Sequence, residues 1–164
     1  KGSDIKICTV IGFPLGNTLT EIKVQEVLCG IQLGAHEFDM VIDVGRIKSG
    51  NWEYVKNDIS RVNNAVKKSD KKLKVILETC LLTHDEIIKC CEICKECSVD
   101  FIKTSTGFST HGATEDVVKL INDTICGTKI GIKASGGLRT KEAVEKMVLV
   151  GATRIGISGE MSFD

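Results

Sequence analysis

Apolar residues follow two alternating patterns along the chain. Short runs rich in β-branched residues predict strands at Ile5–Ile11, Phe38–Val44, Leu73–Leu77, Val99–Ile102, Lys129–Ile132 and Thr153–Ile157. Several of these runs are apolar on consecutive residues, as expected of strands buried on both faces of a parallel sheet. Between these runs the apolar residues recur every three or four positions, as at Val24, Val27, Leu28 and Ile31, which predicts amphipathic helices. The pattern therefore predicts one domain of repeated strand–helix units.

Helix ends are marked by their own signals. A threonine stands just before acidic residues at four expected helix starts, which are Thr20, Thr83, Thr114 and Thr140. Gly34 and Gly151 follow expected helix ends, where glycine readily adopts the left-handed conformation that turns the chain back toward the sheet.

Repeated strand–helix units build either an open doubly wound sheet or a closed (β/α)₈ barrel. No G-x-G-x-x-G sequence follows the first strand, which argues against a dinucleotide-binding sheet. Polar residues stand instead on several strands, most of them near the carboxyl end: Asp39, Glu78, Lys103, Lys133 and Ser158. A site assembled from several strand ends is typical of barrels, although only six strands can be counted.

Composition and charge exclude several classes of partner. The 164 residues include 22 lysines and arginines against 22 aspartates and glutamates, so no overall positive field attracts nucleic acid. The dense basic stretch Lys67–Lys72 contains an acid and is interpreted as a solvated turn. No apolar run approaches the ~20 residues that span a bilayer, and no signal-peptide pattern opens the chain. We expect no nucleic-acid or membrane partner.

Eight cysteines allow two interpretations. Cys91, Cys94 and Cys97 form a C-x-x-C-x-x-C run that resembles part of an iron–sulfur motif, with Cys90 beside it. The run lies inside an amphipathic helix, and the other four cysteines (Cys8, Cys29, Cys80 and Cys126) are scattered. We therefore expect small buried thiols rather than a metal site, and a reducing, cytoplasmic location.

Two lysines carry the strongest chemical signal. Lys103 and Lys133 each end a predicted strand just before a glycine-bearing turn. Burial and a second nearby cation both disfavour the ammonium form, and a neutral amine can attack a carbonyl to form a Schiff base. The pair predicts carbonyl chemistry without a metal or organic cofactor.

Other titratable residues are assigned from their neighbours. Asp39 stands among apolar strand residues, so it needs a cationic partner and is either a structural ion pair or a proton-transfer group near the lysines, with Asp43 a weaker candidate. Lys74 and Glu78 share one strand face and are expected to pair or to support the site. The three histidines, His36, His84 and His111, lack metal-ligand spacing and are expected at the surface.

A glycine-rich turn provides a candidate anion site. Gly136 and Gly137 precede Arg139 at a predicted helix start, where free backbone N–H groups attract anions. The turn that contains Ser158 follows the last strand and could add donors. Barrels often bind phosphate after their seventh and eighth strands.

These motifs together resemble the deoxyribose-phosphate aldolase family. The segments that carry the resemblance are, in order, Thr9–Gly16, Glu37–Val41, Lys74–Thr79, Phe101–Gly107 and Lys133–Arg139, so it covers nearly the whole chain. The resemblance implies a (β/α)₈ barrel, with residues 1–164 forming a single barrel domain that lacks the first two strand–helix units of the family. It also implies a class I aldolase, a carbon–carbon lyase that reversibly cleaves 2-deoxy-D-ribose 5-phosphate to acetaldehyde and D-glyceraldehyde 3-phosphate.

The same resemblance implies roles for individual residues. Lys103 would form the Schiff base, Lys133 would lower the pKa of its amine and move protons, and Asp39 would complete a proton relay through water. The residues expected to hold the phosphate are Gly107, Gly136, Gly137, Arg139 and Ser158. The resemblance further implies a homo-oligomer, dimer or tetramer, that acts in deoxyribonucleotide catabolism.

The last turn departs from the family pattern. Ile157 precedes Ser158 and Gly159 here, where the family usually has a small residue and then a serine pair. Two alternatives therefore stay open from the sequence. One is a non-catalytic barrel that binds sugar phosphates, and the other is a Schiff-base barrel aldolase that acts on a larger keto-sugar.

Overall fold

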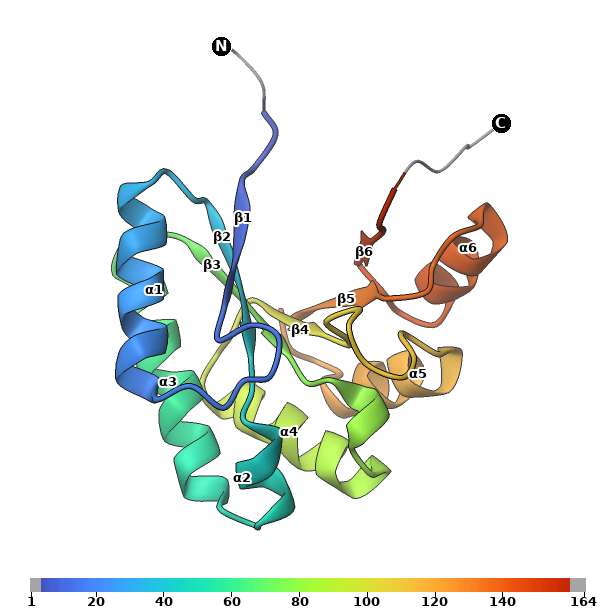
Figure 1. Ribbon diagram of the computed structural model, residues 1–164. Coiled ribbons are helices and arrows are strands. Elements are labelled where there is room, and N and C mark those ends of the chain that lie inside the picture. The colour runs from blue at the N-terminus through green and yellow to red at the C-terminus, as the bar shows by residue number, and fades with distance from the viewer. Residues whose placement is uncertain (1–3, 160–164) are drawn as a thin grey trace.

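The computed structural model describes residues 4–159, which form a curled parallel sheet with helices along its outer side (Figure 1). The strands lie side by side in chain order: β1 (Cys8–Ile11), β2 (Glu37–Val41), β3 (Lys72–Ile76), β4 (Phe101–Lys103), β5 (Gly131–Ser135) and β6 (Arg154–Gly156). Every neighbouring pair is parallel. The sheet is the curved wall of part of a (β/α) barrel, which confirms the predicted fold class.

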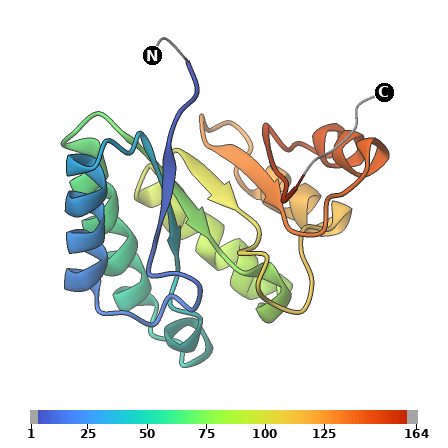
Figure 2. The same cartoon turned by 45° about the horizontal axis from the view of Figure 1, so that its top comes forward.

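Helices connect the strands and cover one face of the sheet (Figure 2). They are α1 (Thr20–Gln32), α2 (Val44–Lys48), α3 (Trp52–Lys67), α4 (His84–Glu96), α5 (Glu115–Thr124) and α6 (Lys141–Leu149), with a 3₁₀ turn η1 (Thr79–Leu81) after β3. Parallel strands require such crossovers, because each strand must begin at the same end of the sheet as its predecessor.

Strand register separates two kinds of side chain. Met40 pairs with Val75, which pairs with Ile102, and all three are fully buried against the helices. One residue away along β2, Asp39 pairs with Lys74 on the opposite face. Because successive side chains on a strand point to opposite faces, one face becomes apolar and the other carries the charged groups.

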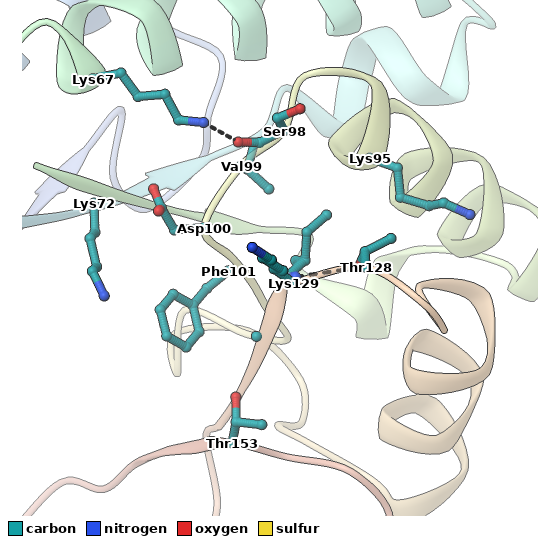
Figure 3. Close-up of a pocket in the computed structure, with 12 residues that line it drawn as sticks. Lys67, Lys72, Lys95, Ser98, Val99, Asp100, Phe101, Thr128, Lys129 and Thr153 are labelled. Atoms are coloured by element: carbon teal, nitrogen blue, oxygen red, sulfur yellow. Dashed lines mark hydrogen bonds between the residues drawn. The ribbon is translucent and has the colours of Figure 1, made fainter. Parts of the chain in front are cut away.

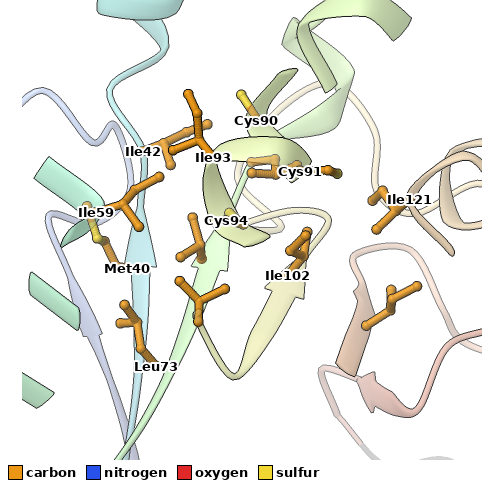
Figure 4. Packing of buried hydrophobic residues seen from close by; sticks show 14 of the residues in the cluster. Met40, Ile42, Ile59, Leu73, Cys90, Cys91, Ile93, Cys94, Ile102 and Ile121 are labelled. Carbon is orange, nitrogen blue, oxygen red and sulfur yellow. The ribbon is translucent and has the colours of Figure 1, made fainter. Parts of the chain in front are cut away.

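The cysteine-rich helix packs on the apolar face. Cys90, Cys91 and Cys94 of α4 are fully buried among Met40, Leu73, Ile102 and their neighbours (Figure 4). Burial raises the pKa of the Cys90 and Cys91 thiols to about 12, so both stay protonated and unreactive at neutral pH. The prediction of buried thiols is confirmed for these three, but it is wrong for Cys8, Cys29 and Cys126, which are exposed.

Most helix starts follow the sequence signals. Thr83, Thr114 and Thr140 cap α4, α5 and α6 through their hydroxyl groups, and Thr83 forms a complete capping box with Glu86. Thr20 is an exception, because α1 begins at Thr20 itself and Leu19 occupies the cap position. Val44, predicted to end a strand, instead begins α2, because Asp43 accepts a hydrogen bond from the Arg46 amide and starts a helix there.

Among residues 4–159, no helix has both the length and the apolar character needed to cross a bilayer.

Candidate active site

Asp39 lies at the centre of a cluster of lysines on the charged face of the sheet. Its Oδ2 atom is 2.8 Å from the Nζ of Lys103 and 2.8 Å from the Nζ of Lys133. Its Oδ1 atom is 2.8 Å from the Nζ of Lys74. The side chains come from β2, β3, β4 and β5, so four successive strands bring one carboxylate and three amines together.

The cluster changes the proton affinities of its members. Burial by itself would raise the pKa of Asp39, but the charges of Lys103, Lys74 and Lys133 outweigh it and hold the pKa well below its usual range. Lys103 behaves oppositely, since burial and the neighbouring Lys133 charge lower its pKa despite the attraction of Asp39. The surroundings of Lys103 therefore shift its amine toward the neutral form, whereas Asp39 stays ionised.

Lys74 has different partners from those expected. Its Nζ lies 2.7 Å from Glu37 Oε2 and 2.8 Å from Asp39 Oδ1. Of the two expected roles, an ion pair with Glu78 is therefore wrong, and a supporting contact to the site is confirmed for Lys74. Desolvation would lower the pKa of Lys74, but the attached carboxylates raise it, which keeps this lysine charged. Glu37 is also bound by Arg154 of β6 at 2.6 Å. The ion pairs thus continue across the charged face from β2 to β6.

Cys8 joins the same cluster from β1. Its thiol donates to Asp39 Oδ1 at 3.2 Å and accepts from Lys74 at 3.3 Å. Neither this contact nor the Glu37–Arg154 pair was predicted from the sequence. The signal that could have found Glu37 is its period-two relation to Asp39 on the same strand.

The predicted anion-binding residues line one cavity with the two lysines. This cavity of about 300 Å³ contains Lys103, Lys133, Gly107, Gly136, Gly137, Arg139 and Ser158 among its lining residues. The structure therefore places the candidate amines and the candidate phosphate-binding turns side by side. Asp39 lies beneath them, bound to both lysines.

Close backbone packing shapes this cavity. The loop after β4 lies against the turn after β5, where the Ala113 amide donates to the Ser135 carbonyl at 3.0 Å. A Cβ atom on Gly112 would lie only 2.0 Å from the Gly136 carbonyl oxygen, so no larger residue fits at this crossing. Gly136 itself has a φ of +85°, a conformation that favours glycine. The glycines are therefore required by the turn itself, whatever it binds.

The remaining candidates have structural positions. Asp43 caps α2 and does not contact the lysine cluster through any hydrogen bond described for residues 4–159. His84 and His111 are exposed, as predicted. His36 is half-buried rather than at the surface, and its Nδ1 atom accepts a hydrogen bond from the Ile7 amide. Within residues 4–159, no three histidine, cysteine or carboxylate side chains gather as metal ligands would.

Another cavity lies at the opposite end of the strands. It has a volume of about 810 Å³ and is lined by four lysines, which are Lys67, Lys72, Lys95 and Lys129 (Figure 3). Lys67 donates to the carbonyl of Ser98, which follows the end of α4, and Lys95 donates to the carbonyl of Thr124, the last residue of α5. Carbonyl groups at helix carboxyl ends attract such cations. Lys67 and Lys95 therefore have a structural explanation, and active sites of barrels lie at the other end of the strands.

Comparisons with known proteins find relatives that match nearly the whole chain. Residues 1–162 match the DeoC family, described as DeoC/LacD family aldolases. The chain is 54% identical over 158 residues to a deoxyribose-phosphate aldolase of Clostridium botulinum. This alignment covers 96% of this chain and 73% of that protein.

Two solved structures share the architecture. An aldolase named QR15 superposes with a TM-score of 0.89 at 41% identity, over 94% of this chain and 69% of that one. A deoxyribose phosphate aldolase from Aeropyrum pernix, described as a unique tetrameric structure, has a TM-score of 0.86 and 32% identity, over 94% of this chain and 64% of that one.

Proposed function

Because the chain belongs to the DeoC/LacD family of aldolases, we propose that it is a class I aldolase that reversibly cleaves 2-deoxy-D-ribose 5-phosphate to acetaldehyde and D-glyceraldehyde 3-phosphate. The single observation that supports the mechanism is the cluster in which Asp39 binds Lys103 and Lys133 at 2.8 Å each. Schiff-base chemistry requires a nucleophilic amine and groups that transfer protons, and this cluster offers an amine with a carboxylate and a second amine beside it.

Lys103 is the proposed nucleophile. Burial lowers its pKa, and the side chain lines the cavity beside the candidate phosphate turns. The neutral amine adds to the aldehyde carbon of the open-chain sugar, and loss of one water gives a protonated imine. That positive nitrogen then accepts the electron pair of the bond to be broken.

Asp39 and Lys133 are the proposed proton-transfer groups. A proton leaves the sugar's C3 hydroxyl, the C2–C3 bond breaks, and D-glyceraldehyde 3-phosphate departs while an enamine stays on Lys103. A proton then returns to the enamine carbon, and water releases acetaldehyde. Asp39 is placed to relay these protons through water because its carboxylate contacts both amines at 2.8 Å.

The glycine turns are the proposed phosphate site. Gly107, Gly136, Gly137, Arg139 and Ser158 line the cavity that contains both lysines. Backbone N–H groups of such turns and the charge of Arg139 complement a phosphate. Binding there would hold the sugar's far end while its aldehyde reaches Lys103.

The wider setting is also part of the proposal. We place the reaction in deoxyribonucleotide catabolism in the cytoplasm, with the sugar phosphate and acetaldehyde as the partners of a homo-oligomer whose chains each contribute one barrel domain. The tetramer described for the Aeropyrum pernix aldolase supports the oligomer.

Borohydride trapping tests the proposal. Reduction in the presence of acetaldehyde should leave an ethyl group on Lys103, which peptide mass spectrometry locates. Lys103→Leu should abolish both trapping and cleavage. Lys129→Leu, which removes a lysine at the opposite end of the strands, is the matched control and should change neither. Trapping at Lys133 alone would reverse the assignment of the two amines.

A further inference from the structure

Two phenylalanine rings meet beside the lysine-bearing cavity. Phe13 belongs to the loop after β1 and Phe108 to the loop after β4, and their ring centroids lie 5.4 Å apart at an interplanar angle of 90°. Phe108 lines the cavity that contains Lys103 and Lys133. It also lines a neighbouring, more apolar cavity of about 350 Å³ formed by the first four loops at this end of the sheet.

Phe108 is 77% exposed, so its side chain borders the open side of the cavity. Its edge-to-face contact with Phe13 is a favourable arrangement for two aromatic rings, and it links loops whose strands are separated by β2 and β3. A large apolar side chain held at the wall of a polar cavity restricts what fits there by its volume.

Glu78 holds the loop that carries Phe108. The Thr106 amide donates to Glu78 Oε1 at 3.2 Å, and the Thr106 hydroxyl donates to Glu78 Oε2. The same hydroxyl accepts a hydrogen bond from the Phe108 amide at 3.0 Å. Glu78 is 5% exposed and has a φ of +53°, uncommon for a residue other than glycine. A buried carboxylate at the end of β3 therefore fixes the backbone of Phe108 through one hydroxyl group.

We propose that the Phe13–Phe108 pair limits the size of the aldehyde that can reach Lys103, and that Glu78 is the positioning residue that holds Phe108 in place. The inference rests on the proposed aldolase function. The two-carbon donor is small enough to pass the rings. The second aldehyde must extend from Lys103 along the cavity wall that Phe108 forms, so short aldehydes are accepted and bulky ones are excluded.

Competing acceptors measure the size limit. In the condensation direction, with acetaldehyde as donor, kcat/KM is determined for D-glyceraldehyde 3-phosphate and for phenylacetaldehyde. The selectivity ratio is kcat/KM for phenylacetaldehyde divided by kcat/KM for D-glyceraldehyde 3-phosphate. Phe108→Ala should raise this ratio by about 10-fold or more, the discrimination that a few methylene volumes give. Phe13→Ala should shift the ratio in the same direction. In the double variant the ratio should rise by less than the product of the two single fold-changes, because both changes remove one shared obstruction.

Glu78 is tested by the same ratio. Glu78→Ala should raise it, because the Thr106 hydroxyl loses its acceptor and Phe108 is released. Glu78→Gln keeps one acceptor oxygen, enough for one of the two Thr106 donors, and should raise the ratio less than Glu78→Ala does. A merely structural role for Glu78 would lower kcat/KM for both aldehydes equally and leave the ratio unchanged, which would overturn the positioning role.

Controls separate this inference from the proposed function. Leu33→Ala removes a side chain that is 86% exposed and away from the cavity, and it should leave the ratio unchanged. Acetaldehyde trapping on Lys103 is measured for every variant, because the small donor passes with or without the rings. Trapping with an unchanged ratio in Phe108→Ala overturns the size limit alone. Absence of trapping in the unmodified chain overturns the proposed function, and the size limit with it.

Discussion

The two faces of this sheet are built from neighbouring residues but are held together by different forces. On the helix-covered face, Met40, Val75 and Ile102 are fully buried in an apolar cluster with α3 and α4. On the other face, Asp39 joins three lysines through contacts of 2.8 Å. Removal of apolar area from water stabilises the first face, whereas the second must satisfy every charge it buries.

The difference explains how one short strand can serve both stability and chemistry. In β2, Phe38 and Met40 face the helices, while Glu37 and Asp39 face the lysines. The apolar face tolerates changes of shape at a cost in stability. The charged face has few alternatives, because each group there is the partner of another.

Changing Asp39 should produce the largest effect. Asp39→Asn keeps the side-chain shape but removes the charge that both Lys103 and Lys133 contact. We expect kcat to fall by roughly 10²- to 10⁴-fold, the usual contribution of a proton-transfer group. Steady-state cleavage of 2-deoxy-D-ribose 5-phosphate measures it.

A second buried carboxylate provides the matched control. Asp58 of α3 binds Lys23 of α1 at 2.6 Å, and both side chains are almost fully buried behind the sheet. Asp58→Asn should destabilise the fold by about 3–5 kcal/mol while the folded fraction retains its kcat. Equal losses of kcat in the two variants would contradict the separation of the faces.

Truncation on the apolar face should affect stability alone. Met40→Ala leaves a cavity beneath the helices and should lower the free energy of unfolding by about 2–5 kcal/mol. Urea denaturation measures the loss, and kcat per folded molecule should stay within twofold of the original. A large fall in kcat would show that the apolar packing also sets the position of Asp39.

Acid should weaken the charged face by a smaller amount. The pKa of Asp39 is depressed in the folded chain, so its contribution to stability is complete above the unfolded value of about 3.9 and is lost as pH falls below it. One such group contributes at most about 1.4 kcal/mol per pH unit. The stability difference between the original chain and Asp39→Asn, measured by urea denaturation, should be constant from pH 7 to 5 and should shrink below about pH 4. A constant difference down to pH 3 would contradict this linkage.

Periodicity alone located all six strands to within a few residues, because most of them carry runs of apolar residues. The expected burial on both faces is confirmed for β2 but is wrong for the edge strands β1 and β6, which are partly exposed. It failed where a single side chain changed the outcome. Asp43 began a short helix at Val44, and Thr20 entered α1 instead of capping it. The lysine and glycine segments could be recognised because each ends a strand, and parallel strands bring such ends to the same edge of a sheet.

The sequence by itself determined the strand–helix order, the apolar face and the set of residues available for chemistry. Only the tertiary structure decided which polar groups meet. In it, Lys74 pairs with Asp39 and Glu37, and Glu78 accepts a hydrogen bond from the Thr106 amide. The physical reason is that partners across a parallel sheet are set by strand register and by the curl of the sheet. Both depend on how residues far apart in the chain pack together, so neither can be read from local spacing.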